Sequence, residues 1–151
     1  MAAANEQTTG DGRPLWEPAL HDVVLARRRI APYLEPTPLL RPPALGRALG
    51  CDAYLKCENL QPIGAFKVRG GVNLVAAEHE SGRLGAGGIA AASTGNHGQS
   101  IAFAARLFGL PATIFAPRDA NPLKVAAMRA LGAEVRLEGH DFDAAREACE
   151  A

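Results

Sequence analysis

The sequence predicts an α/β protein built on a parallel twisted sheet with flanking helices. Three short apolar segments with the character of buried strands recur about every twenty residues in the second half of the chain, with a helical pattern after each. The predicted strands are residues 88–93, 112–116 and 133–137. Connections of this length favour parallel pairing with right-handed crossovers, which place the helices on the faces of the sheet.

Capping residues bound the predicted helices of this half. A helix over 97–108 ends at Gly109, and the next one has Asn121 as N-cap and Pro122 in its first turn. A last helix begins after Asp141, but the chain reaches Ala151 without any C-terminal helix signal. We therefore expect this chain to be an incomplete part of a longer protein.

The first half is less regular. A short helix is expected over 18–30, and a longer one over 67–80 has its apolar positions on one face. Between them, repeated prolines break any helical pattern, so segment 39–40 is extended at most, while 53–57 alternates like a strand. The small and polar residues 1–15 predict a flexible N-terminal arm.

Composition narrows the class of protein. The 151 residues are 48% hydrophobic and 21% charged, which favours a packed, soluble domain. Sixteen basic residues balance sixteen acidic ones, which argues against a nucleic acid or an anionic membrane as partner. Three cysteines without CxxC spacing, and no apolar run long enough for a bilayer, favour a cytoplasmic protein without a metal site.

One candidate ligand site is the segment 93–98, between a predicted strand and the helix that follows it. Ligands of open α/β sheets lie beyond the carboxyl ends of the strands, and the N–H groups of a helix start favour an anion. The glycines of this segment allow a ligand to approach the backbone closely. Ser, Thr and Asn are also the preferred capping residues, so a simple N-cap cluster is the equal alternative.

A second candidate is Lys67, at the start of a predicted helix. The helix dipole repels a cation there, and this repulsion with burial beside Phe66 would favour the neutral amine that Schiff-base chemistry requires. The alternative is an exposed lysine whose amino group reaches water. For Lys56 and Lys124 we expect surface or local ion-pair roles, and for Arg69 a structural one.

Four segments carry a resemblance to a known family. The sequence E-N-L-Q-P-I-G-A-F-K-V-R-G at 58–70 resembles the cofactor-lysine segment of the serine/threonine dehydratases and serine racemases, which are fold-type II pyridoxal-phosphate enzymes. A-S-T-G-N-H-G-Q-S at 92–100 is similar to the second motif of that family, and P-T-P-L at 36–39 and L-G-A-E-V at 131–135 to two others. The four occur in the family's order across about residues 30–150.

The resemblance implies a role for each matching residue. Lys67 would hold pyridoxal phosphate as a Schiff base and later take the proton from the substrate Cα. Phe66 would pack against the cofactor ring, and Asn96 would hydrogen-bond its 3′ oxygen. The substrate, a small amino acid, would have its carboxylate bound largely by backbone N–H groups at Ser93, Thr94, Gly95 and His97.

The implied reaction is α,β-elimination from L-threonine or L-serine, which gives a 2-oxo acid and ammonia. Thr94 stands where racemases carry a serine that serves as acid or base on the opposite face, so a catalytic role for Thr94 in racemisation is an alternative. A threonine synthase and a non-catalytic remnant are further alternatives. Ala65 replaces the family's usual serine and removes one hydroxyl. A nucleotide-binding module is disfavoured, because no GxGxxG or P-loop follows any predicted strand.

The resemblance also implies a domain plan. Residues 53–151 would form the smaller α/β domain of a two-domain enzyme, and residues 16–52 the first part of the larger domain. The remainder of the larger domain, with a glycine-rich loop for the cofactor phosphate, would be absent, so the isolated chain is expected to be inactive. The full-length form is expected to be a homo-oligomer.

Overall fold

The computed structural model describes residues 18–151. Its helices are α1 (Leu20–Ile30), α2 (Pro43–Leu49), the short 3-10 helix η1 (Glu58–Leu60), α3 (Lys67–Glu80), α4 (Asn96–Leu107), α5 (Pro122–Ala130) and α6 (Phe142–Glu150). Its strands are β1 (Leu39–Leu40), β2 (Leu55–Lys56), β3 (Ile89–Ala92), β4 (Ala112–Ala116) and β5 (Glu134–Leu137). The N-terminal arm predicted at residues 1–15 lies outside the described residues.

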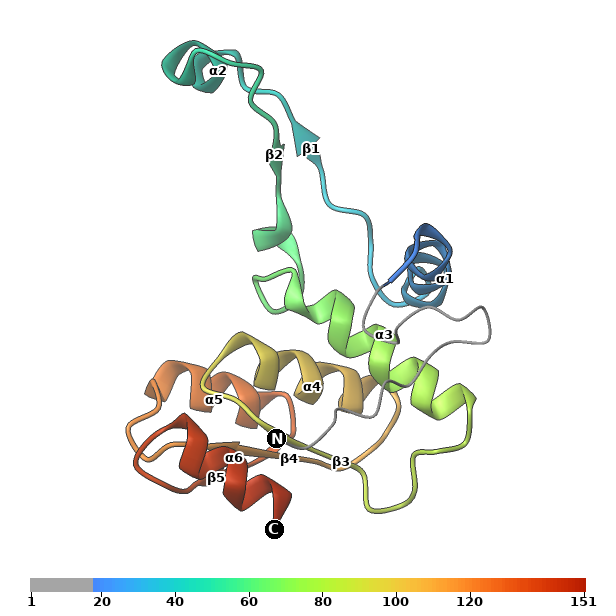
Figure 1. Cartoon of the computed structure of the whole chain (residues 1–151), viewed down its shortest axis with the longest axis vertical. Helices are drawn as coiled ribbons and strands as arrows, with labels where there is room; N and C mark the ends of the chain where they lie inside the picture. Colours follow the sequence, from blue (N-terminus) through green and yellow to red (C-terminus); the bar gives the residue numbers. More distant parts are fainter. Residues whose placement is uncertain (1–17) are drawn as a thin grey trace, which may run out of the picture.

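The sheet has the predicted parallel topology. Its strand order is β3-β4-β5, with Ile89 opposite Ala112 and Thr113 opposite Glu134. Helices α4 and α5 cover one face, α6 packs on the other, and α3 forms a further layer outside α4 (Figure 1). This arrangement confirms the α/β class and puts the starts of α4 and α5 at the carboxyl end of the sheet.

Two apolar clusters hold these layers together. One lies between the sheet and the two helices above it, and is built around Ile101, Ile114 and Met128. The other joins α1, α3 and α4 through Ile30, Leu34, Val68, Val72, Val75 and Ala104. Helix α3 is therefore fixed on two sides, which gives its first residue a defined position.

Helices α3 and α4 approach each other most closely at Gly71 and Ser100. A Cβ atom on Gly71 would lie 2.0 Å from Ser100 Oγ and 2.8 Å from its carbonyl oxygen. The fully buried Ser100 hydroxyl donates to the carbonyl oxygen of Lys67 at 2.7 Å. Only glycine allows this contact, and the contact brings the starts of the two helices together.

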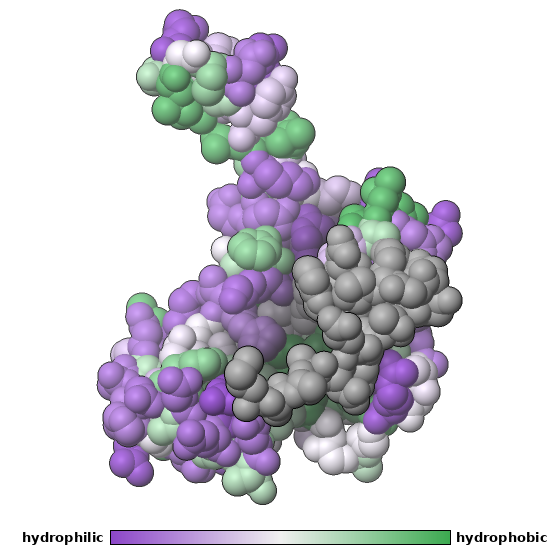
Figure 2. Space-filling view, in the orientation of Figure 1, coloured by the Kyte–Doolittle hydropathy of each residue, from purple (hydrophilic) through white to green (hydrophobic). Residues whose placement is uncertain are grey.

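The segment between Pro38 and Cys57 departs from the prediction. It forms an antiparallel pair, β1 with β2, and carries α2 at its tip. This projecting arm stands clear of the rest of the molecule (Figures 1 and 2). Helix α2 was not predicted, because proline usually breaks a helix, whereas Pro43 occupies the first helical position, where proline is tolerated. Strand β2 is also shorter than the predicted 53–57.

Within residues 18–151, no helix combines the length and the apolar character needed to cross a bilayer.

Candidate active site

Lys67 and His97 line the same cavity, although thirty positions separate them in the sequence. Lys67 is the first residue of α3 and His97 is the second residue of α4. The cavity measures about 440 Å³, and its walls are Phe66, Lys67, Arg69, Gly70, Gly71, Leu74, His97 and Ile101. The structure thus joins the two candidate segments into one site.

A larger cavity of about 630 Å³ lies at the tip of the projecting arm, beside α2. It contains none of the predicted site residues. Two of its charged side chains are already engaged, because Arg41 pairs with Asp52 and lies over the ring of Tyr54. The smaller cavity at Lys67 is therefore the better candidate for chemistry.

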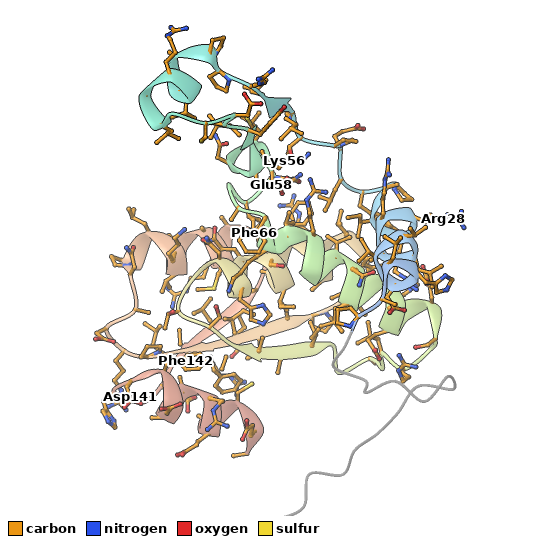
Figure 3. The ribbon with its side chains drawn as sticks, turned by 45° about the horizontal axis from the view of Figure 1, so that its top comes forward. Arg28, Lys56, Glu58, Phe66, Asp141 and Phe142 are labelled. Carbon is orange, nitrogen blue, oxygen red and sulfur yellow. The ribbon has the colours of Figure 1, made fainter. Side chains whose placement is uncertain are left out.

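The amino group of Lys67 has no carboxylate partner among residues 18–151. Lys67 is exposed, and no acidic side chain of the described chain lies within ion-pair distance of it. The predicted burial beside Phe66 is wrong, because 63% of Phe66 is exposed at the start of α3 (Figure 3). The structure therefore exposes both the lysine and the aromatic side chain that precedes it, and both line the same cavity.

The pKa of His97 depends in part on the charge of this amine. Partial burial lowers the pKa of His97 from its ordinary value of 6.5, and the positive charge of Lys67 lowers it further. Both causes disfavour the imidazolium and favour the neutral ring, which has one hydrogen-bond donor and one acceptor.

The side chain of Ser93 caps α4. Its hydroxyl oxygen accepts hydrogen bonds from the backbone N–H groups of Gly95 at 3.1 Å and Gly98 at 2.8 Å, and only 5% of Ser93 is exposed. The N–H groups of Asn96 and His97 belong to the first turn of α4, so they have no acceptor within the helix, and no loop or side-chain acceptor within residues 18–151 reaches them. The backbone N–H of Ser93 donates to the Phe115 carbonyl oxygen at 2.8 Å, and that of Gly95 donates to the Ser93 hydroxyl. The prediction that these two N–H groups bind a carboxylate is therefore wrong, whereas those of Asn96 and His97 remain available to an anion.

Glycines shape the same loop. A Cβ on Gly95 would meet nothing within 4 Å, so the backbone there is open to a ligand. A Cβ on Gly98 would lie 2.5 Å from the sulfur of Met128, so this glycine serves the packing of α4. Thr94, which precedes Gly95, is exposed.

Asn96 is held by a residue for which the sequence suggested no site role. The side-chain oxygen of Asn96 accepts from Lys124 Nζ at 2.7 Å and from Gln99 Nε2 at 3.3 Å. Lys124 is half-buried in the first turn of α5. A cation in the first turn of a helix is electrostatically misplaced, and the argument that singled out Lys67 applies equally to Lys124.

A polar network fixes the segment that carries Lys67. Arg69 donates through Nε and one terminal nitrogen to the two carboxylate oxygens of Glu58, both at 2.8 Å. Thr37 donates to the same carboxylate at 2.5 Å, and Lys56 donates to the Thr37 carbonyl at 2.6 Å. Figure 3 shows Glu58 and Lys56 at the base of the projecting arm.

This network is strongly charge-assisted. The hydrogen bonds from Arg69 are the largest cause that lowers the pKa of Glu58 from 4.5 to about 2, partial burial opposes them, and the Thr37 hydroxyl adds to the effect. Glu58 precedes Lys67 in the sequence and Arg69 follows it. The ion pair therefore connects η1 to the first turn of α3, which carries the lysine. Arg69 has the structural role expected for it.

Comparison with known proteins identifies the family. The family described as pyridoxal-phosphate dependent enzyme matches residues 30–151. The chain belongs to this family. Among the pyridoxal-phosphate dependent enzymes, it is 45% identical to an L-threonine ammonia-lyase of Thermotoga maritima over 129 residues, which are 85% of this chain and 32% of that protein.

Solved structures of pyridoxal-phosphate dependent enzymes share the fold. A threonine deaminase from T.th. superposes with a TM-score of 0.77 at 40% identity, over 88% of this chain and 41% of the deaminase. A pyridoxal 5′-phosphate-dependent aspartate racemase superposes with a TM-score of 0.83 at 33% identity, over 91% of this chain and 43% of the racemase. The chain spans about a third of the length of the curated relatives that it matches.

The residues present fit pyridoxal phosphate. Its aldehyde requires a primary amine without a competing carboxylate, which Lys67 supplies within the described chain. Its ring would find an exposed aromatic side chain in Phe66, and its 3′ oxygen would find a donor in the amide nitrogen of Asn96, which has no acceptor among residues 18–151. The cavity is also large enough for a small ligand.

Proposed function

We propose that this chain supplies the lysine-bearing part of a threonine or serine ammonia-lyase. The observation that carries the proposal is the amine of Lys67, which has no carboxylate partner among residues 18–151 and lines one cavity with the first turn of α4. Relatives named as threonine ammonia-lyase and threonine deaminase support this reaction over others in the family.

Each residue has a role that its position supports. Lys67 Nζ would hold the cofactor through its aldehyde, and as a free amine it would accept the proton from the substrate Cα. Phe66 packs on the ring, and the Asn96 amide donates to the 3′ oxygen. When bound, pyridoxal phosphate withdraws electron density from the substrate Cα and so makes that proton removable.

The first turn of α4 binds the substrate carboxylate. The N–H groups at Thr94 and His97 donate to it, while the side chain of Ser93 and the open backbone at Gly95 shape the loop. The lowered pKa of His97 disfavours a further positive charge on the imidazole beside Lys67.

The overall reaction is balanced without an oxidant. The Cα–H bond breaks and its proton passes to Lys67, the Cβ–O bond breaks, and the hydroxyl group leaves as water after taking up a proton. The enamine product would leave the site, and a proton would move from its nitrogen to Cβ to give an imine. Water would add to the imine carbon, and the C–N bond would then break to release ammonia and the 2-oxo acid.

Racemisation is a second candidate. Thr94 carries an exposed hydroxyl in the loop that precedes α4, and the solved aspartate racemase superposes well on this chain. Thr94 would return a proton to the face opposite Lys67. Because threonine is branched at Cβ, its rotamers are restricted, and elimination is the favoured reaction.

The domain plan, location and assembly belong to the same proposal. Residues 53–151 would form the smaller domain, and residues 16–52 would begin the larger one. The full-length enzyme is cytoplasmic, homo-oligomeric and acts on a small amino acid.

Borohydride trapping tests the site. This chain has three lysines, Lys56, Lys67 and Lys124, so reduction of the complete gene product with pyridoxal phosphate and peptide mapping distinguishes them. We expect the label on Lys67, and no visible absorption band in Lys67→Ala, while Lys56→Ala keeps the band. A label on another lysine would contradict the site. Incubation with L-threonine and L-serine should yield 2-oxo acids, and D-amino acids as main product would favour racemisation instead.

A further inference from the structure

Lys124 and Asn96 form a polar contact between two helix starts. Lys124 is the third residue of α5 and Asn96 is the first residue of α4, and Nζ lies 2.7 Å from Oδ1. No carboxylate among residues 18–151 pairs with Lys124. Two helix dipoles oppose the cation there, so its attraction to the amide oxygen needs to offset that repulsion.

The chemistry of this contact fixes the orientation of the Asn96 amide. An ammonium group has only hydrogen-bond donors, so the atom facing it must be the carbonyl oxygen of the amide. Gln99 donates to the same oxygen at 3.3 Å, in agreement with this assignment. The two N–H bonds of Asn96 Nδ2 therefore point away from Lys124.

Those N–H bonds are free for a ligand. No residue among 18–151 accepts from Asn96 Nδ2. The atom also reaches solvent, because every buried side-chain nitrogen and oxygen in the described part of the chain has a partner. The carbonyl oxygen of the Asn96 side chain therefore faces Lys124, and its amide N–H groups reach solvent.

We propose that Lys124 is a positioning residue that keeps Asn96 a donor toward the 3′ oxygen of the cofactor. The inference rests on the proposed function. Without Lys124, the amide can rotate by half a turn and present its oxygen to the anionic 3′ oxygen, which would repel it. Lys124 itself acts through Asn96 and need not touch the cofactor.

A spectroscopic double-mutant cycle tests the proposal in the complete gene product loaded with pyridoxal phosphate. A donor on the 3′ oxygen favours the form in which that oxygen shares no proton with the adjacent nitrogen. Lys124→Met should therefore raise the pH midpoint of the visible band by about half a unit or more. Lys124→Arg retains the donors and should restore the midpoint.

The cycle separates positioning from a direct effect of charge. In an Asn96→Ala background, Lys124→Met should cause little further shift, because the amide through which it acts is gone. An unchanged midpoint in Lys124→Met, or a shift of the same size with and without Asn96, would overturn the proposal.

A measurement without cofactor covers the case in which Lys124→Met does not fold. The hydrogen-bonded ammonium of Lys124 should give a slowly exchanging ¹⁵N–¹H signal in the wild-type protein, and this signal should disappear in Asn96→Ala. A signal that persists would overturn the contact on which the proposal stands. If the wild-type protein itself shows no visible band, the proposed function fails, and this result is distinct from failure of the role of Lys124.

Discussion

The Glu58–Arg69 pair offers the most direct test of how the chain holds Lys67 in place. Glu58→Gln removes the negative charge with little change of shape. Arg69 then loses its ion pair, and the charged hydrogen bonds that connect η1 to the first turn of α3 are weakened. We expect the protein to be less stable and the site to be less ordered.

The size of the effect follows from the pKa of Glu58. A fall from 4.5 to about 2 corresponds to at most about 3.4 kcal/mol at 1.36 kcal/mol per pH unit. Solvent reaches 20% of the Glu58 side chain and 30% of that of Arg69, and screening weakens such pairs. We therefore expect Glu58→Gln to lower the free energy of unfolding by about 1–2 kcal/mol at neutral pH.

The effect should depend on pH with a definite sign. Because folding lowers the pKa of Glu58, its contribution is complete above about pH 4.5 and is lost as the pH falls through about 2. The difference between wild type and variant should shrink across this window. Urea unfolding, followed by circular dichroism at a series of pH values, measures it.

Glu78→Gln is the matched control. Glu78 also pairs with an arginine, Arg83, through Nε at 2.6 Å and a second nitrogen at 2.7 Å, but at the far end of α3 and with Arg83 mostly exposed. Its loss should cost less and leave the Lys67 site unchanged. Equal losses in the two variants, or a Glu58→Gln effect that is the same at pH 7 and at pH 2.5, would refute the reasoning.

Three further predictions concern the site. Gly71→Ala should force α3 away from Ser100 and cost about 1–3 kcal/mol, and a wild-type melting temperature would contradict the close contact. Lys67→Met should raise the pKa of His97 in an NMR titration but leave it below 6.5, because burial is the larger cause, and an unchanged pKa would mean that the two groups are not neighbours. Ser93→Ala should cost about 1–2 kcal/mol in urea unfolding through loss of two capping hydrogen bonds, with Ser93→Thr closer to wild type.

The second half of the chain was predictable because its signals are local. The predicted strand 112–116 matches β4 in both bounds, and the predicted strand 133–137 differs from β5 by one residue. Asn121 accepts from the N–H of Leu123 as an N-cap should, and Asp141 accepts from that of Ala144. Each of these features depends on residues a few positions apart, which a pattern can capture.

The projecting arm was missed because its structure depends on long-range pairing. Leu39 faces Lys56, which lies seventeen positions later in the sequence, and nothing in either two-residue strand specifies that register. The prolines that argued against helix sit where α2 begins, and Gly50 ends that helix with a φ of 67°. Local propensity thus indicated the breaks correctly but not what lies between them.

The site was predicted in part for a similar reason. Lys67 and the segment 93–98 could be found from position and resemblance, yet the partners that orient them come from distant parts of the chain. Lys124 follows Asn96 by 28 positions, and Thr37 precedes Glu58 by 21. Such contacts require the tertiary fold, which a single sequence without contact information does not specify.

The residues of the site share one electrostatic feature, which is a positive potential at the starts of the helices. Lys67 and Lys124 both stand in first turns, where the helix dipole makes a cation unfavourable, and the free N–H groups of α4 add further positive potential. The described residues place no carboxylate beside either lysine. This part of the fold therefore holds positive charge that no carboxylate within residues 18–151 compensates, and the charge of Lys67 adds to burial, the larger cause, in lowering the pKa of His97. An anionic ligand would relieve the repulsion, so the binding of a carboxylate or a phenolate oxygen here would stabilise the fold as well.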